Sequence, residues 1–185
     1  HVGPFLPNRT EAVELFLQAY RDERAQSPCL PRRALDDPAW IRSALGSKLA
    51  NPGVVVVEDD HLLAYMLTGD LFDWKGQRAV FLPEYAHAAT AQRKQALYQD
   101  MYQSLAQGWV DQGRHMHLIG TFAHDDLLQE TLYQLGFGAL VAERLRDTAL
   151  IDGCRETPVT TVQELSELVD LHIEHIHFYP QSPIP

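Results

Sequence analysis

The sequence predicts an α/β or α+β domain with a mixed sheet, and three observations support that prediction. Residues 54–57 are four consecutive valines, which is typical of a strand buried on both faces. After Pro83 the apolar residues change from strand-like alternation to the spacing of a long helix. A short apolar strand follows that helix, and a strand, a helix and a second strand in this order predict a right-handed parallel crossover.

Two helices are predicted before the valine strand. Thr10 can cap a helix with an apolar stripe, which the prolines Pro28 and Pro31 then end. Asp37 followed by Pro38 is a start signal for a second helix, and the Asn-Pro-Gly sequence at residues 51–53 ends it.

Three sequential antiparallel strands are predicted over residues 54–82. The turn residues Asp59 and Asp60 lead from the valine strand into a strand at residues 61–68. A second turn, at residues 74–77, leads into a third strand at residues 78–82.

The second half is predicted to be helical on either side of one short strand. The helix after Pro83 should end at Gly113, before a strand at residues 116–121. The next helix begins with acidic residues, which suit the positive end of the helix dipole, and ends at Gly136. Residues 138–145 are expected to return as a strand.

Composition limits the kinds of partner. The 185 residues suit one domain of ordinary size, with 45% hydrophobic and 22% charged residues. The net charge of −10 and the scattered basic residues argue against nucleic acid, because phosphate binding needs concentrated Lys and Arg. No stretch approaches the roughly 18 apolar residues of a membrane span, and a signal-peptide pattern is lacking, so we expect a cytoplasmic protein without a membrane partner.

An internal repeat favours a tandem arrangement. The sequence Gln-Ser-Pro follows the first helix at residues 26–28 and recurs at residues 181–183, after an apolar-periodic segment at 162–177. The chance alternative stays open, because Ser-Pro is common after helices. The tandem interpretation makes residues 1–150 one domain, 151–160 a linker and 161–185 the opening helix of a second domain. The apolar face of that helix would then need the missing domain or a homodimer partner, and it comprises Leu165, Leu168, Leu171 and Ile176.

The element order from residue 54 to 146 and the helix exit Leu-Tyr-Gln-Leu-Gly-Phe at residues 132–137 resemble the GCN5-related N-acetyltransferase (GNAT) family. The resemblance covers about half of the chain. It implies a mostly antiparallel mixed sheet with a central β-α-β crossover and helices on both faces. It also implies acetyl-CoA as cofactor, a small-molecule or peptide amine as acceptor, and divergence of the parallel strands 78–82 and 116–121 at their C-terminal ends. The chain resembles the N-terminal domain of a tandem GNAT protein.

The resemblance also assigns the cofactor contacts. The pantetheine arm would lie along the strand residues Val80, Phe81 and Leu82, and the phosphates along the loop 86–93, which includes Ala89, Thr90, Ala91 and Arg93. The family's loop reads Gln/Arg-x-x-Gly-x-Gly/Ala, and Ala86, Ala89 and Ala91 replace its key positions. Alanine keeps the N–H donors but adds a methyl group and disfavours positive φ. Weak or absent acetyl-CoA binding is the expectation.

Three residues are candidates for proton transfer. Tyr133 lies one residue after the position of the family's thiolate-protonating tyrosine, and one residue turns a helical side chain by about 100°. Glu84 and His124 are candidates for the general base. For all three, a structural or solvated surface residue is the alternative.

Metal binding is not predicted. His172 and His175 share a helical face, with His177 and Cys154 elsewhere, but a structural zinc site usually needs four ligands in tighter pairs. Two functions from different classes are the leading candidates, and a general α/β ligand-binding domain is a third. The first is an acetyl-CoA-dependent N-acyltransferase. The second is a non-catalytic GNAT-like module that supports substrate binding or the assembly of a second, catalytic domain.

Overall fold

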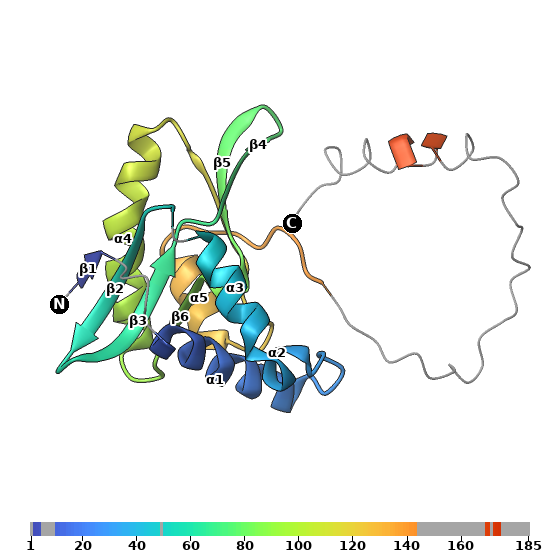
Figure 1. Ribbon diagram of the computed structural model, residues 1–185. Coiled ribbons are helices and arrows are strands. Elements are labelled where there is room, and N and C mark those ends of the chain that lie inside the picture. Colours follow the sequence, from blue (N-terminus) through green and yellow to red (C-terminus); the bar gives the residue numbers. More distant parts are fainter. Residues whose placement is uncertain (1, 5–9, 49, 144–168, 171, 175–185) are drawn as a thin grey trace, which may run out of the picture. The chain divides into compact units, whose positions relative to one another are not determined.

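The computed structural model describes residues 2–4, 10–48, 50–143, 169–170 and 172–174. The chain divides into two compact units, His1–Leu145 and Arg146–Pro185. Figure 1 shows the helices and strands of the first unit.

The strands of the first unit form two hydrogen-bonded sheets. The first has the strand order β1-β2-β3-β6 and is antiparallel throughout. Its strands are β1 (Val2–Pro4), β2 (Gly53–Glu58), β3 (His61–Leu67) and β6 (His87–Ala89). The second has the order β4-β5-β7, and its β5–β7 pair is parallel. Its strands are β4 (Asp70–Trp74), β5 (Gln77–Leu82) and β7 (Met116–Ile119).

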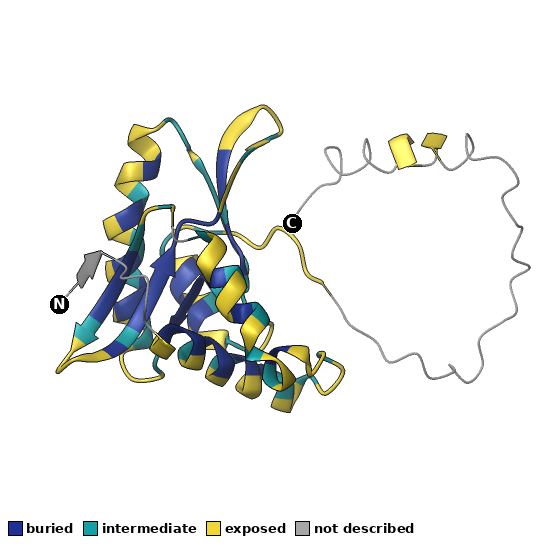
Figure 2. Ribbon diagram, in the orientation of Figure 1, coloured by how far each residue is buried: buried dark blue, intermediate teal, exposed yellow. Residues whose placement is uncertain are grey.

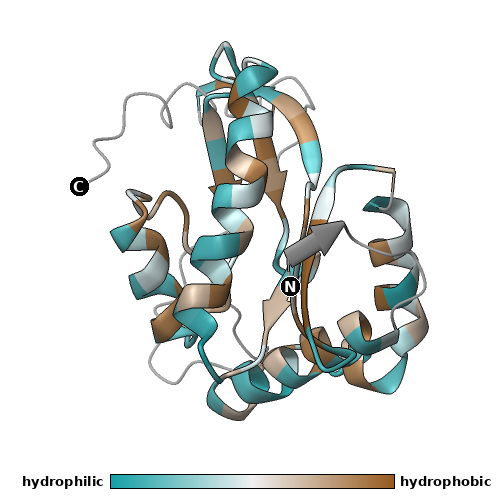
Figure 3. Cartoon of the chain, turned by 90° about the vertical axis from the view of Figure 1, so that its left-hand side faces the viewer, coloured by the Kyte–Doolittle hydropathy of each residue, from teal (hydrophilic) through white to brown (hydrophobic). Residues whose placement is uncertain are grey.

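Helices cover both faces of the sheet. They are α1 (Thr10–Gln26), α2 (Arg33–Asp36), α3 (Pro38–Lys48), α4 (Lys94–Asp111) and α5 (Asp126–Gln134), with the 3₁₀ turn η1 (Glu84–Ala86). Helix α4 packs against β2, β3 and β6 and contacts α5, while α1 packs against β3, β6 and α3. Figure 3 shows α4 on one side of the strands and α3 on the other. The fold class expected from the sequence, a mixed α+β sheet with a β-α-β crossover, is confirmed.

Both tight hairpins form where the sequence predicts them. Asp59 and Asp60 have φ values of 48° and 62°, and Lys75 and Gly76 have values of 48° and 78°. Two consecutive residues with positive φ are the signature of a type I′ turn, whose twist matches that of antiparallel strands.

The third predicted strand pairs differently from the expectation. Strand β5 pairs with β4, which lies between the second and third predicted strands and was not itself predicted. The chain bends between β3 and β4 at Gly69, where a Cβ atom would lie 1.9 Å from the carbonyl oxygen of Phe81. The absence of a side chain permits this close approach, so a glycine divides one long hairpin between two sheets.

The core lies between the sheet and the helices, as Figure 2 shows by the burial of the strands and inward helix faces. Its largest fully buried side chains include Trp109, Tyr65 and Phe16. The buried indole of Trp109 donates a hydrogen bond to Oγ1 of Thr68 at 2.9 Å, which satisfies its one polar group.

The C-terminal part of the chain differs in part from the prediction. Residues 138–143 form no strand, and Val141 in that segment is 70% exposed, so the predicted return strand is wrong for the part described. Its apolar residues pack against no strand partner among the described residues, and a strand needs such a partner. In the second unit, residues 169–170 and 172–174 are helical, within the predicted helix 162–177. The linker 151–160 and Leu165, Leu168, Leu171 and Ile176 lie outside the described residues.

No helix in the described part of the chain is long and apolar enough to cross a membrane.

Candidate active site

The parallel strands β5 and β7 stay paired to their C-terminal ends, and the chain leaves β7 only after β5. Strands β5 and β7 pair continuously up to Leu82 and Ile119, and the N–H of Gly120 still donates to the carbonyl of Leu82 at 2.8 Å. The divergence expected within these two strands is therefore wrong. The 3₁₀ turn η1 interrupts the chain after Pro83 and carries it to β6, which pairs with β3 and not with β7. The chain therefore leaves β7 at η1 and β6, after β5, and not at the end of β5 as predicted.

Strand β6 has an edge that no described strand covers. On its other side the N–H of Thr90 donates to the carbonyl of Leu63, and Ala88 lies opposite Tyr65. Hydrogen bonding alternates along an antiparallel strand, so the N–H and C=O groups of His87 and Ala89 point toward the open edge. These are main-chain groups of the kind that an extended ligand arm can pair with.

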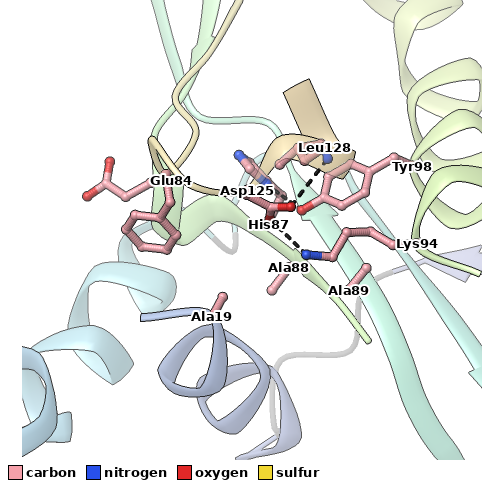
Figure 4. A pocket seen from close by; sticks show the side chains of 10 residues that line it. Ala19, Glu84, His87, Ala88, Ala89, Lys94, Tyr98, Asp125 and Leu128 are labelled. Atoms are coloured by element: carbon pink, nitrogen blue, oxygen red, sulfur yellow. Dashed lines mark hydrogen bonds and ion pairs between the residues drawn. The ribbon is translucent and has the colours of Figure 1, made fainter. Parts of the chain in front are cut away.

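A narrow pocket lies beside that edge (Figure 4). Its walls come from α1 at Ala19, from β6 at His87, Ala88 and Ala89, and from α4 at Lys94 and Tyr98; Phe122, Asp125 and Leu128 complete them together with Glu84. Its enclosed part has room for about one water molecule. A larger ligand would extend beyond this enclosed part.

A buried hydrogen-bonded chain crosses the point of separation. The Tyr98 hydroxyl lies 2.8 Å from Nδ1 of His87, and Nε2 of His87 lies 2.8 Å from the carbonyl oxygen of Gly120. The carbonyl can only accept, so Nε2 carries the proton and Nδ1 accepts from Tyr98. Burial lowers the pKa of His87 to about 4 and raises the pKa of Tyr98 well above its ordinary value. The neutral ring of His87 therefore links β6 to Gly120, the residue that follows β7.

An ion pair closes another side of the pocket. Nζ of Lys94, the first residue of α4, lies 2.8 Å from Oδ2 of Asp125, and both side chains are mostly buried. Asp125 also caps α5, because its other oxygen accepts from the N–H of Leu128. Figure 4 shows the two side chains meeting across the pocket.

The turn that leads into α4 is shorter than the predicted loop. Ala86 belongs to η1 and Ala89 to β6, so the turn comprises residues 90–93. Its left-handed residue is Arg93, with φ of 58°, and neither Ala89 nor Ala91 has a positive φ. The position where glycine would suit the backbone is therefore Arg93. The Arg93 guanidinium pairs with the Glu58 carboxylate at 2.9 Å, on the exposed β2–β3 hairpin.

His124 and Glu23 form a second polar pair next to the pocket. Oε1 of Glu23 lies 3.0 Å from Nδ1 of His124, and Oε2 accepts from the His124 backbone N–H at 2.9 Å. Ser27 donates its hydroxyl to the same carboxylate at 3.0 Å. Burial alone would raise the pKa of Glu23, but the hydrogen bonds from His124 and Ser27 outweigh it and hold that pKa below its ordinary value.

The structure brings only some of the predicted site residues together. Glu84 and Ala89 line the pocket, and His124 directly precedes Asp125. Val80 and Phe81 are paired on both sides, by β4 and β7, and Leu82 is paired with Ile119 of β7. Tyr133 is 54% exposed and does not line the pocket. Thr90, Ala91 and Arg93 lie in the turn before α4.

Sequence reasoning missed the residues that build the site: His87, Tyr98, Lys94, Asp125 as a pocket residue, and Glu23. Among these contacts, only those between tyrosine and histidine have a signal in the sequence. Tyr98 and Tyr102 lie one helical turn apart, and each contacts a strand histidine, because the Tyr102 hydroxyl lies 2.9 Å from Nδ1 of His117. Glu23 and His124 are far apart in sequence, and no local pattern relates them.

Metal ligands do not cluster in the described part of the chain, where no group of three or more His, Cys, Asp or Glu side chains could hold an ion. His172 is described and exposed, whereas Cys154, His175 and His177 lie outside the described residues.

The strand order, the β-α-β crossover and the departure of β6 from β7 are those of a GNAT-like fold. The structure is similar to a ribosomal-protein-alanine N-acetyltransferase from Brucella melitensis biovar Abortus 2308, with a TM-score of 0.56 and 13% identity over 80% of this chain and 97% of that one. It is also similar to a GCN5-related N-acetyltransferase from Ralstonia eutropha JMP134, with a TM-score of 0.54 and 13% identity over 80% of this chain and 99% of that one. No family model and no curated protein matches the sequence.

Proposed function

We propose that this chain is an N-acyltransferase domain that takes an acetyl group from acetyl-CoA and transfers it to a primary amine. The observation that carries the proposal is the open edge of β6, which faces a pocket where the neighbouring parallel strand has ended. The names of the two similar structures, both N-acetyltransferases, support the same reaction class.

The residues present suit acetyl-CoA in part. The backbone of His87 and Ala89 offers donors and acceptors to a pantetheine arm, and the N-terminus of α4 with Arg93 and Lys94 offers positive charge to phosphates. Three features oppose binding: the small pocket, the pairing of Lys94 with Asp125, and the lack of glycine in the turn. We therefore expect binding that is weak and that requires the Lys94–Asp125 pair to open.

The small enclosed volume of the pocket and the Lys94–Asp125 pair also favour the second candidate, a non-catalytic module that supports a further GNAT-like domain in a tandem protein. One pair of experiments separates the two candidates. Isothermal titration calorimetry measures acetyl-CoA binding by the full chain, and a thiol assay follows coenzyme A release with a panel of small-molecule and peptide amines. Binding together with amine-dependent release supports the acyltransferase, and binding without release supports the module. No binding at millimolar acetyl-CoA overturns the acyltransferase.

A further inference from the structure

Two histidines lie near the pocket, and their hydrogen bonds give them different chemical capacities. His87 uses both ring nitrogens, one toward Tyr98 and one toward Gly120, and is 3% exposed. Both nitrogens are occupied, so it has no site for a proton from a ligand. His124 uses only Nδ1, its side chain is 49% exposed, and its Nε2 has no partner among the described residues.

The buried carboxylate of Glu23 determines which nitrogen of His124 carries the proton. An ionised carboxylate only accepts hydrogen bonds, so Nδ1, at 3.0 Å from Oε1, must be the N–H. The second oxygen accepts the His124 backbone N–H, and this contact fixes the position of the residue as well as its ring. The Ser27 hydroxyl donates to the carboxylate and lies 3.4 Å from Nδ1, so it does not compete for Nε2. In the neutral ring the lone pair is then on Nε2.

Glu23 and His124 both lie next to residues that line the pocket, but they come from different parts of the chain. Glu23 is one helical turn beyond Ala19 on α1, and His124 lies between Phe122 and Asp125 on the segment before α5; all three of these neighbours line the pocket. A carboxylate that orients an imidazole, which in turn presents an unprotonated nitrogen, is the arrangement of a general base.

We propose that His124 is the general base for the acceptor amine and that Glu23 is its positioning residue. This inference rests on the proposed acyl transfer. Nε2 takes one proton from the acceptor ammonium, and the freed nitrogen forms a C–N bond to the thioester carbonyl carbon. The C–S bond breaks with its electron pair on sulfur, and the second proton of the attacking nitrogen passes to the thiolate.

The first test is the tautomer, which does not depend on activity. Two-bond ¹H–¹⁵N correlation spectra of the full chain, labelled with ¹⁵N-histidine, report which nitrogen of each neutral ring is protonated. We expect the Nδ1–H form for His124 and its loss in Glu23→Gln, whose amide cannot accept both bonds. The exposed His61→Gln serves for assignment and should leave the His124 signals unchanged. An Nε2–H form of His124 in the wild type overturns the proposal.

The second test is transfer to an amine. In His124→Gln the turnover number should fall about 100-fold or more, with acetyl-CoA binding unchanged. In Glu23→Gln it should also fall, again without a change in binding, because the base is present but misoriented. Unchanged turnover in His124→Gln, a larger loss in Glu84→Gln than in His124→Gln, or a wild type without transfer overturns the proposal. If the wild type does not bind acetyl-CoA, the result counts against the proposed function, whichever tautomer His124 has.

Discussion

Lys94 and Asp125 join the first residue of α4 to the N-cap of α5, with 2.8 Å between Nζ and Oδ2. Both residues line the pocket, and under the proposed function the Asp125 carboxylate would repel a diphosphate there. The ion pair links α4 to α5 beside the pocket, and the hydrogen bond from Nε2 of His87 to Gly120 links β6 to the residue that follows β7.

Asp125→Asn should strengthen acetyl-CoA binding, because it frees Lys94 and removes a negative charge from the pocket. Asparagine is as good an N-cap as aspartate, so α5 should keep its start. Calorimetry on this variant, beside the exposed neighbour Asp126→Asn as a matched control, measures the effect. Equal affinity in Asp125→Asn and the wild type would show that the ion pair does not limit access.

His87 should make stability depend on pH between about 6.5 and 4. Its pKa is about 4 in the folded protein, below the ordinary value of 6.5, so the unfolded chain binds the proton first as pH falls. Its contribution is complete above pH 6.5 and is lost as pH falls toward 4. His87→Gln can keep both hydrogen bonds without titrating. In urea unfolding, the stability advantage of the wild type over this variant should shrink by about 3 kcal/mol from pH 7 to pH 4.

The carboxylates and the other histidines titrate in both proteins, so the difference between them isolates His87. A constant difference across this pH range would mean that His87 is not held neutral by burial.

Gly69→Ala should destabilise the fold by about 3 kcal/mol or more, because its Cβ would meet a backbone oxygen that cannot move away easily. Gly108→Ala is the matched control. It lies in α4, has nothing within 4 Å of the added methyl, and should stabilise the protein by about 0.5–1 kcal/mol. Thermal or urea unfolding measures both. Unchanged stability in Gly69→Ala would contradict the close approach of Gly69 to the carbonyl oxygen of Phe81.

Arg93 tests the backbone of the turn before α4. Arg93→Gly and Arg93→Ala both lose the exposed pair with Glu58, but only glycine adopts φ of 58° without steric cost. The glycine variant should be about 1 kcal/mol more stable than the alanine variant in urea unfolding. Equal stabilities of the glycine and alanine variants would mean that residue 93 is not left-handed.

Local signals account for the parts of the fold that the sequence predicts well. The turns at Asp59 and Lys75, the helix start at Pro38 and the stop at Gly136 depend on short-range backbone chemistry, and all occur as predicted. The division of strands between sheets was not predictable, because it depends on the close approach of Gly69, between β3 and β4, to Phe81 of β5.

Site prediction failed for the same reason. The strand β6 has only three residues, His-Ala-Ala, and no periodicity marks it. The open edge was therefore assigned to Val80, Phe81 and Leu82, which have the stronger strand propensity. Val80 and Phe81 are paired on both sides, and Leu82 is paired with β7. The partners Glu23 with His124 and Lys94 with Asp125 come together only through the packing of helices around the sheet.

The most direct test of the central claim is an acetyl-CoA titration of the ¹⁵N-labelled full chain, followed by ¹H–¹⁵N correlation spectra of the backbone amides. We expect saturable shifts of the amides of His87, Ala89 and Lys94, along the open edge of β6 and the start of α4, with larger affinity in Asp125→Asn. Unshifted amides in both proteins at several millimolar acetyl-CoA, or shifts confined to other elements, would contradict the proposal that β6 holds the coenzyme.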